Sequence, residues 1–510
     1  MIRRVAFVLP LLALCGCEVG PDYMRPPAPV PTDYKEDRGW MPASPQQAAG
    51  WENWWAIYND PILDGLEKQV DVSNQNLKSA EAAYRVARAT VGIDRGTLLP
   101  AISANASVRE SGGGSRNTII PSGGDASGTS VVSGGGGTRA TYQTSLGGTW
   151  DIDVWGRIRR TVEGDIATAQ ASAADVAAAR LSAQSLLAVD YFQLRAADAQ
   201  AQLFMSSIED FQTALQIARN RVQAGVTTLA DVYAAQTQID TAQAQLINLQ
   251  LTRAQMEHAI ATLIGQPTNA FAIQPAPLAT NIPVVPAGVP STLLERRPDI
   301  ASSEYTMTAA NAEIGVAISA WYPALTLTGS YGFASSTLGS LLTTPNSVWS
   351  FGPSLAEVIF NGGARVAQTE QARARYDQTV AAYRQTVLTA FQQVEDQLAA
   401  LKVLEQQAAV DNQTVADARR SEELALNQYR AGTADFTTVI TAQTARFNAE
   451  SAAVNVQNQR LAASVNFVVV LGGGWDNSRI PQPGFFYKLP EVTAVDTPAQ
   501  TPASAPAPLQ

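Results

Sequence analysis

The side chains that could carry out covalent or metal chemistry are few in this chain. Its 510 residues include one histidine, His258, and two cysteines, Cys15 and Cys17. Metal clusters and Cys/His dyads need several such groups converging on one point. His258 lies in an amphipathic stretch without a partner motif, so its simplest interpretation is a surface or packing histidine. We therefore expect no enzyme, no metal and no bound cofactor.

Two other patterns that can indicate catalysis have a structural explanation. The glycine runs Gly134–Gly137 and Gly472–Gly474 lack the lysine and the following helix of a phosphate-binding loop. Asp151 and Asp153 could form an acid–base pair, but they alternate with apolar residues as the wet face of a strand does. We expect this pair to face a water-filled interior.

The thiol of Cys17 has the clearest chemical context. Two arginines precede the apolar run Val5–Leu14, which is too short to span a bilayer, and the sequence Leu-Cys-Gly-Cys ends at Cys17. This arrangement resembles a bacterial lipoprotein signal. The resemblance implies a signal peptide at 1–16 and lipid on the thiol and new amine of Cys17. A general secretory signal with an incidental cysteine is the alternative.

Charge excludes one class of partner. The formal net charge of −10 becomes −12 once the two arginines of the signal leave (−10 − 2 = −12). Binding to nucleic acid depends on positive charge, so no nucleic acid partner is expected. The acidic balance suits a pathway that repels anions or favours cations. Residues 17–50 are proline-rich and indicate an extended tether, while the Pro/Ala/Thr-rich residues 488–510 indicate a disordered tail.

The chain between these ends is a duplication. The Ala-Gly pairs that end at Gly225 and Gly432 lie 207 residues apart (432 − 225 = 207), whereas Gly92 and Gly315 lie 223 apart (315 − 92 = 223). The difference of 16 (223 − 207 = 16) indicates an insertion in the first copy, which the Gly/Ser-rich residues 111–137 supply. We expect an α+β membrane protein with two repeats, 51–275 and 276–487, each in the order helix–strand–strand–helix–helix.

Each repeat is predicted to contain two strands, and each strand has one apolar face. The alternating segments are Leu99–Val108, Tyr142–Val154, 323–333 and 349–359. Their length and aromatic content are typical of transmembrane strands, although a soluble sandwich would show the same alternation. Strands in lipid must close into a barrel, and known barrels begin at about eight strands. If these strands span a membrane, several chains must share one barrel.

Very long helices follow the strands. Arg157 to about Arg221 contains no proline, and Gly363–Arg430 is of similar length. At about 1.5 Å per residue, some 60 residues would reach roughly 90 Å. After its Ala-Gly turn, each is followed by a shorter partner, Leu229–Ile264 or Phe436–Leu471. Alanine is dense in the first long helix and lets helices pack closely, so coiled-coil hairpins are expected. A soluble bundle or a rod is the alternative.

Several motifs resemble outer-membrane efflux lipoproteins of the TolC superfamily, in the OprM and NodT branch. They are the start Cys17-Glu18-Val19-Gly20-Pro21-Asp22-Tyr23 with Arg25-Pro26, the segment Trp51–Trp55 with Asp60-Pro61, the run Leu294-Glu295-Arg296-Arg297-Pro298-Asp299-Ile300, and the two Ala-Gly turns. The resemblance implies a homotrimer with a twelve-stranded barrel in the outer membrane and a helical tunnel through the periplasm. It also implies a periplasmic adaptor and an inner-membrane pump as partners.

The family gate lies at the periplasmic helix turns, where acidic residues narrow the opening. Alignment on Gly432 puts the two acidic positions of TolC-like members at Thr438 and Thr441, so this chain departs from the pattern. The nearest acids are Asp231 and Asp435.

We expect Asp231 and Asp435 to form the constriction, with Tyr429 and Arg430 as linking partners. Ordinary helix capping by these acids is an equally weighted alternative. The small residues of the turns are the expected adaptor contacts, namely Ala224, Gly225, Val226, Ala431, Gly432 and Thr433.

The function that this resemblance implies is a passive outer-membrane exit duct for drugs or small toxic compounds. A duct for type I protein secretion is the near alternative, and a structural surface lipoprotein is the alternative of another class. The transported substrate, the pump class, the part of the gate acids in selectivity and the role of residues 111–137 stay open.

Overall fold

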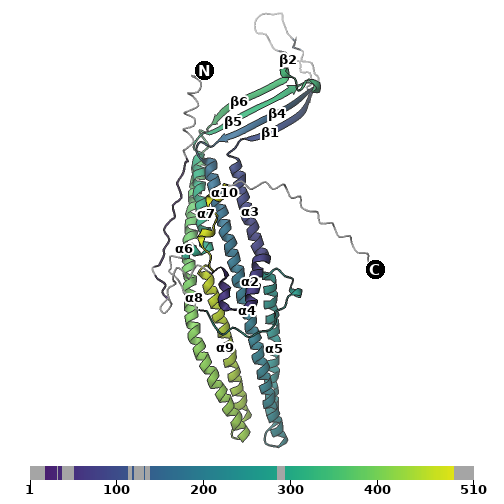
Figure 1. Ribbon diagram of the computed structural model, residues 1–510, viewed down its shortest axis with the longest axis vertical. Helices are drawn as coiled ribbons and strands as arrows, with labels where there is room; N and C mark the ends of the chain where they lie inside the picture. Colours follow the sequence, from purple (N-terminus) through teal and green to yellow (C-terminus); the bar gives the residue numbers. More distant parts are fainter. Residues whose placement is uncertain are drawn as a thin grey trace, which may run out of the picture.

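The chain is elongated, with strands at one end and two helical hairpins at the other (Figure 1). The computed structural model describes residues 18–31, 33–36, 51–112, 118–119, 131–132, 138–283 and 293–487. The predicted signal peptide, Cys17, the 488–510 tail and most of the 111–137 segment lie outside the described residues.

The predicted duplication is confirmed. The first repeat contains α2 (Pro61–Ser73), α3 (Gln75–Gly96), β1 (Ala101–Gly112), β4 (Thr138–Ile152), α4 (Arg157–Gln223) and α5 (Leu229–Leu263). The second contains α6 (Leu293–Arg296), α7 (Pro298–Ser319), β5 (Ala324–Ser335), β6 (Ser347–Ala356), α8 (Ala364–Ala431) and α9 (Phe436–Val470). The start of α3 maps onto α7 by the longer offset (75 + 223 = 298), and α4 maps onto α8 by the shorter one (157 + 207 = 364). The insertion therefore lies between β1 and α4, in the segment that also carries the short pair β2 (Thr118–Ile119) and β3 (Val131–Val132).

One tertiary contact is also duplicated. Gly265 has φ +67, and a Cβ built on it would lie 2.5 Å from the carbonyl oxygen of Ser73. Gly472 has φ +99, and its Cβ would lie 2.1 Å from the carbonyl oxygen of Arg296. Since 73 + 223 = 296 and 265 + 207 = 472, the two contacts are equivalent. Only glycine permits this approach of the end of each hairpin to the start of its repeat.

The four long strands form one antiparallel sheet in the order β1-β4-β5-β6. Leu146, Tyr331 and Trp349 are paired across three strands and are exposed in the single chain. On the opposite face Asp151, Thr326 and Ser354 form a polar row, and Thr326 donates a hydrogen bond to Asp151 (2.9 Å). The predicted apolar and polar faces are therefore confirmed.

The strand ends differ from those predicted. β1 begins at Ala101 rather than Leu99 and continues to Gly112, and β4 ends at Ile152. Asp153 lies beyond the strand and accepts hydrogen bonds from the backbone N–H groups of Ile158 (3.1 Å) and Arg159 (2.9 Å). It caps α4 instead of continuing the wet face, because unpaired N–H groups at a helix start attract a carboxylate.

The long helices lie side by side in one layer. α4 has 67 residues and α8 has 68, so each is about 100 Å long. Near the strands the neighbours run α3-α4-α7-α8, and toward the tips they run α5-α4-α9-α8. Asn74 separates the first two helices, since it ends α2 and its side chain accepts a hydrogen bond from Leu77 N–H (2.9 Å) at the start of α3.

In the described part of the chain, none of the helices combines the length and apolar character needed to cross a membrane.

The largest apolar core lies midway along the helices. The tryptophan motif belongs to it, with Trp54 and Trp55 at 1% and 2% exposure. Asp60 caps α2 by accepting from Ile62 N–H (2.9 Å) and also accepts from the Tyr191 hydroxyl (2.5 Å). The motif residues thus fasten the first short helix to α4.

Candidate functional site

The two hairpin tips have the same backbone. At the first, Val226 N–H donates to the Arg221 carbonyl (2.9 Å) and Gly225 N–H donates to the Val222 carbonyl (3.0 Å). The second repeats both bonds, from Thr433 to Gln428 (2.9 Å) and from Gly432 to Tyr429 (3.1 Å). Gly225 and Gly432 have φ +72 and +76, so each tip is a Schellman motif closed by a left-handed glycine.

Every residue predicted for adaptor contact is exposed in the single chain. Val226 is the most apolar of them and is 63% exposed. The six residues lie at the two tips, which end side by side at the same end of the body (Figure 1). A glycine-ended turn alone explains their conformation, so their exposure supports a contact surface without assigning one.

Tyr429 links the two hairpins, and its partner is Arg221, which the sequence analysis did not single out. The Arg221 guanidinium donates to the Tyr429 carbonyl and lies 4.4 Å from the centre of the Tyr429 ring. Tyr429 is 2% exposed and its ring lies 5.2 Å from that of Phe436. A cation over an aromatic face is attracted by the ring quadrupole. The last-turn position of Arg221, beside the negative end of α4, was the available signal.

The electrostatics of Tyr429 bring Asp231 into the same site. Burial raises the pKa of the Tyr429 phenol, Arg221 opposes that shift, and the negative charge of Asp231 adds to it. The Asp231 carboxylate is half-buried and accepts a hydrogen bond from the Thr227 hydroxyl. Arg221, Tyr429 and Asp231 therefore interact, although they come from two hairpins.

Asp435 and Arg430 are placed differently. Asp435 is exposed at the N-cap of α9, and its side chain makes no capping hydrogen bond. Arg430 is exposed and has no hydrogen bond or ion pair with the described residues of the single chain. Both remain accessible to a second chain.

A second link between the hairpins lies farther from the tips. Arg446 of α9 pairs with Asp210 of α4 (2.5 Å) and with Glu422 of α8 (2.9 Å). Burial raises the pKa of Glu422, and the positive charge of Arg446 partly offsets that rise. Arg446 thereby joins three helices, and this contact was not predicted.

The residues at the tips form contacts that join the two hairpins. Among the described residues, no group of His, Cys, Asp or Glu side chains could hold a metal ion. His258 is exposed on α5. The tip residues instead combine hydrogen bonds, charges and packing that can hold two hairpins together or release them.

One apolar and one polar sheet face are typical of transmembrane β-barrels, and here long helical hairpins continue the sheet. The family model described as "Outer membrane efflux protein" matches residues 66–266 and 289–473, so both tips fall within it. The chain belongs to this family. It is therefore an outer-membrane channel of tripartite efflux pumps and not an enzyme.

Known relatives and solved structures match this chain over nearly its whole length. The toluene efflux pump outer membrane protein TtgC of Pseudomonas putida is 31% identical over 465 residues, covering 91% of this chain and 93% of the relative. The pyoverdine export outer membrane protein OpmQ of Pseudomonas aeruginosa is 29% identical, covering 92% and 96%. The solved outer-membrane channel OprN superposes with a TM-score of 0.81 at 28% identity, covering 90% of this chain and 100% of that structure. The CmeC channel of Campylobacter jejuni gives 0.81 at 25%, covering 92% and 97%.

Proposed function

We propose that three copies of this chain form a lipid-anchored exit duct that passes small molecules across the outer membrane. The observation that carries the proposal is the open four-stranded sheet. Within the described strands, β1 and β6 each pair with one neighbour only. In lipid these edges must be paired, and three copies would supply twelve strands (3 × 4 = 12).

The helical layer supports the same assembly. It is four helices wide at both levels, and α8 forms one edge throughout its length. The other edge is α3 near the strands and α5 near the tips. A neighbouring copy can extend the sheet and the layer with one rotation, so the barrel would continue into a tunnel of matching width.

The names of the relatives support a small-molecule cargo. They describe efflux of toluene, solvents and antibiotics and export of pyoverdine. A passive duct leaves selection to its pump, so we propose the class of cargo and not one compound. In this proposal Cys17 carries the lipid, and the repeats 51–275 and 276–487 each contribute half of the protomer.

We propose a periplasmic adaptor as the partner at the tips and an inner-membrane pump beyond it. The exposed tip residues Val226 and Thr433 are the contacts to test first. Cysteines at these positions should crosslink to a co-expressed adaptor, whereas a cysteine at exposed Val86 on α3 should not. Equal crosslinking at all three positions would remove the tips as the docking site.

We propose that the gate is the Arg221–Tyr429 link, with Asp231 beside it and with Asp435 and Arg430 available to neighbouring copies. The link joins hairpins that must separate for a tunnel to widen at its end. Its burial and its cation–aromatic geometry support a closed resting state.

The assembly can be tested with the purified full-length protein. We expect a trimer by light scattering in mild detergent, ion conductance in planar bilayers, and restored toluene tolerance in a host that lacks its own channel. A monomer without conductance would reject the duct. A conducting trimer that fails to restore tolerance with any efflux pump would reject the efflux role and leave the duct.

A further inference from the structure

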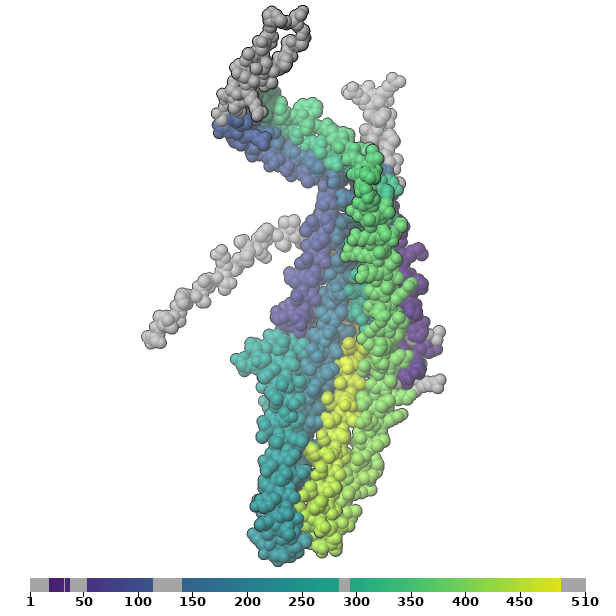
Figure 2. All heavy atoms as spheres, turned by 180° about the vertical axis from the view of Figure 1, so that it is seen from behind, coloured from purple at the N-terminus to yellow at the C-terminus, as the bar shows by residue number. Residues whose placement is uncertain are grey.

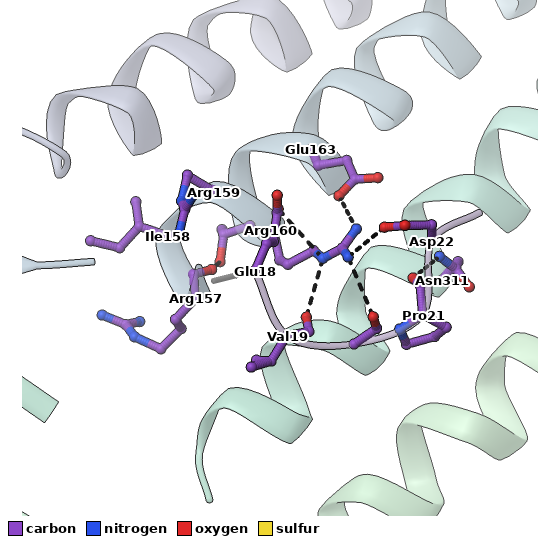
Figure 3. Close-up of polar contacts among 12 residues, drawn as sticks. Glu18, Val19, Pro21, Asp22, Arg157, Ile158, Arg159, Arg160, Glu163 and Asn311 are labelled. Atoms are coloured by element: carbon purple, nitrogen blue, oxygen red, sulfur yellow. Dashed lines mark hydrogen bonds and ion pairs between the residues drawn. The ribbon is translucent and has the colours of Figure 1, made fainter. Parts of the chain in front are cut away.

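The segment that follows Cys17 is not a loose tether in its described part. Val19 N–H donates to the Trp155 carbonyl (3.2 Å), and the Asn311 side chain donates to the Pro21 carbonyl (2.9 Å). Trp155 belongs to the first repeat and Asn311 to the second. Residues 18–22 therefore lie across the seam between the repeats, at the end of α4 that adjoins the strands (Figure 3).

Arg160 is the centre of this contact. Its side chain is only 4% exposed, and its guanidinium pairs with the carboxylates of Glu18 (3.4 Å) and Asp22 (2.8 Å). It also donates to the carbonyls of Val19 (3.3 Å) and Gly20 (3.5 Å). Glu163, one turn along α4, supplies a third carboxylate (2.7 Å). A buried guanidinium without such partners would be strongly unfavourable.

The N-terminal segment also fits closely against α4 and α7 in shape. Gly20 has φ +105, and a Cβ added to it would lie 2.5 Å from the Cα of Gly315. A Cβ on Gly315 would in turn lie 2.9 Å from the Cγ of Arg160. The N-terminal segment, α4 and α7 thus meet at a point where no side chain larger than hydrogen fits.

Contacts continue toward the middle of the body. Arg25 pairs with Glu304 of α7 (3.0 Å) and donates to the Tyr383 hydroxyl of α8 (3.2 Å). The backbone N–H groups of Lys35 and Glu36 donate to the Glu395 carboxylate (2.7 and 3.1 Å). Figure 2 shows the purple N-terminal atoms lying against the green α8. The segment therefore follows a defined path along the second repeat.

We propose that residues Glu18–Asp22 are an intramolecular ligand of the seam between the repeats, and that Arg160 is the positioning residue that fixes where the membrane anchor leaves the body. The inference rests on the proposed lipid at Cys17. Because the acylation site precedes Glu18 by one peptide bond, a fixed Glu18 limits the anchor's starting point to a few ångströms. The lipid anchor would then keep a fixed position relative to the strands.

Two variants release the segment by different means. Arg160→Gln removes the charge that binds both carboxylates. Gly20→Ala leaves Arg160 intact but introduces a methyl group against the Gly315 backbone. The matched controls are Arg157→Gln, which changes an exposed arginine one turn earlier, and Gly65→Ala, whose added Cβ meets no atom within 4 Å.

Hydrogen–deuterium exchange on the lipidated trimer measures the docking directly. We expect the Val19 amide to be protected in the wild type and in both controls, and to exchange at least tenfold faster in both test variants. A spin label at Met24→Cys should report one depth relative to the bilayer in the wild type and a broad range in the test variants. Trimer mass and conductance should not change.

An unprotected Val19 amide in the wild type would overturn the proposal, as would unchanged exchange in Gly20→Ala. If Arg160→Gln fails to assemble, Gly20→Ala decides the question. Palmitate labelling of the wild type and of Cys17→Ser tests the lipid anchor separately from the docked segment. A protected Val19 amide in a chain that takes up no palmitate would reject the lipid anchor and retain the docked segment.

Discussion

The two hairpins share a backbone but differ in what holds them. In the first, Leu215 and Ile239 are buried in one apolar cluster. The equivalent positions of the second hairpin are Glu422 and Arg446 (215 + 207 = 422; 239 + 207 = 446). Two apolar positions in one repeat therefore hold an ion pair in the other, and Arg446 also pairs with Asp210 of the first hairpin.

The tips differ in a complementary way. Tyr429 replaces Val222 (222 + 207 = 429), and Gln428 replaces Arg221 (221 + 207 = 428). The first hairpin supplies the cation and the second supplies the buried ring and the carbonyl that bind it. Divergence between the copies has thus produced contacts between the hairpins that a symmetric pair could not make. Because the two hairpins contribute different groups to this contact, a change in either group can weaken it.

Breaking the buried ion pair should have the largest effect. Arg446→Ile leaves the Glu422 carboxylate buried without its partner, which typically costs about 3–5 kcal/mol. We expect the midpoint of chemical unfolding to fall accordingly. The matched control is the double variant Glu422→Leu/Arg446→Ile, which copies the first hairpin and should unfold within about 1 kcal/mol of the wild type. Equal losses in both variants would show that the link to Asp210 dominates instead.

Removing the buried ring should be the next largest effect. Tyr429→Ala deletes a side chain packed on Phe436, and we expect a loss of about 3 kcal/mol in unfolding free energy. Tyr429→Phe should change stability by less than about 0.5 kcal/mol, because the hydroxyl is buried without a hydrogen-bond partner. Val222→Ala, at the equivalent half-buried position, should cost less than Tyr429→Ala. A costly Tyr429→Phe would reveal a partner for the hydroxyl in the trimer.

Weakening the Arg221–Tyr429 link between the tips should raise the open probability of the channel more than it lowers the free energy of unfolding. Arg221→Gln removes a hydrogen bond from a charged donor, worth about 1.5–3 kcal/mol. We expect about a tenfold higher open probability in planar bilayers, since 1.4 kcal/mol corresponds to a factor of about ten. Arg219→Gln, which changes an exposed arginine two residues earlier on α4, is the matched control. An equal rise in open probability in both variants would assign the effect to lost positive charge and not to the link.

The pH dependence should differ between the hairpins because only the second buries a carboxyl at this level. Burial raises the pKa of Glu422 above that of the unfolded chain. The folded state therefore holds this proton more tightly, and its contribution to stability is lost as pH rises through the raised pKa. Thermal unfolding from pH 4 upward should show this decline in the wild type and a shallower one in Glu422→Gln. A parallel decline in both would assign it to other groups.

The smallest effects are expected at the two acids. Asp435→Asn keeps a good N-cap residue at an exposed position and should change stability by less than about 0.5 kcal/mol. Asp231→Asn, at a half-buried position beside Tyr429, should reduce cation preference in bilayers more than Asp435→Asn does. Unchanged conductance and cation preference in both single variants would remove the acids from the gate.

Much of the fold could be predicted because local patterns are sufficient to define it. Alternation along Tyr142–Val154 follows from a strand with one face in contact with lipid. The break at Asn74 follows from a side chain that caps a helix, and the tips follow from glycines with positive φ. The offsets between the repeats even located the insertion. The strand alternation, the break and the tips each depend on residues that are neighbours in the sequence.

The sequence by itself therefore determined the elements, their duplication, the apolar face of the sheet and the exposed tips. Only the tertiary structure decided which side chains meet across the repeats. Arg221 and Tyr429, or Arg160 and Glu18, are more than a hundred residues apart, and spacing does not show which faces of two long helices will touch. Charged groups can pair in many ways along such helices, and packing selects one arrangement by burying it.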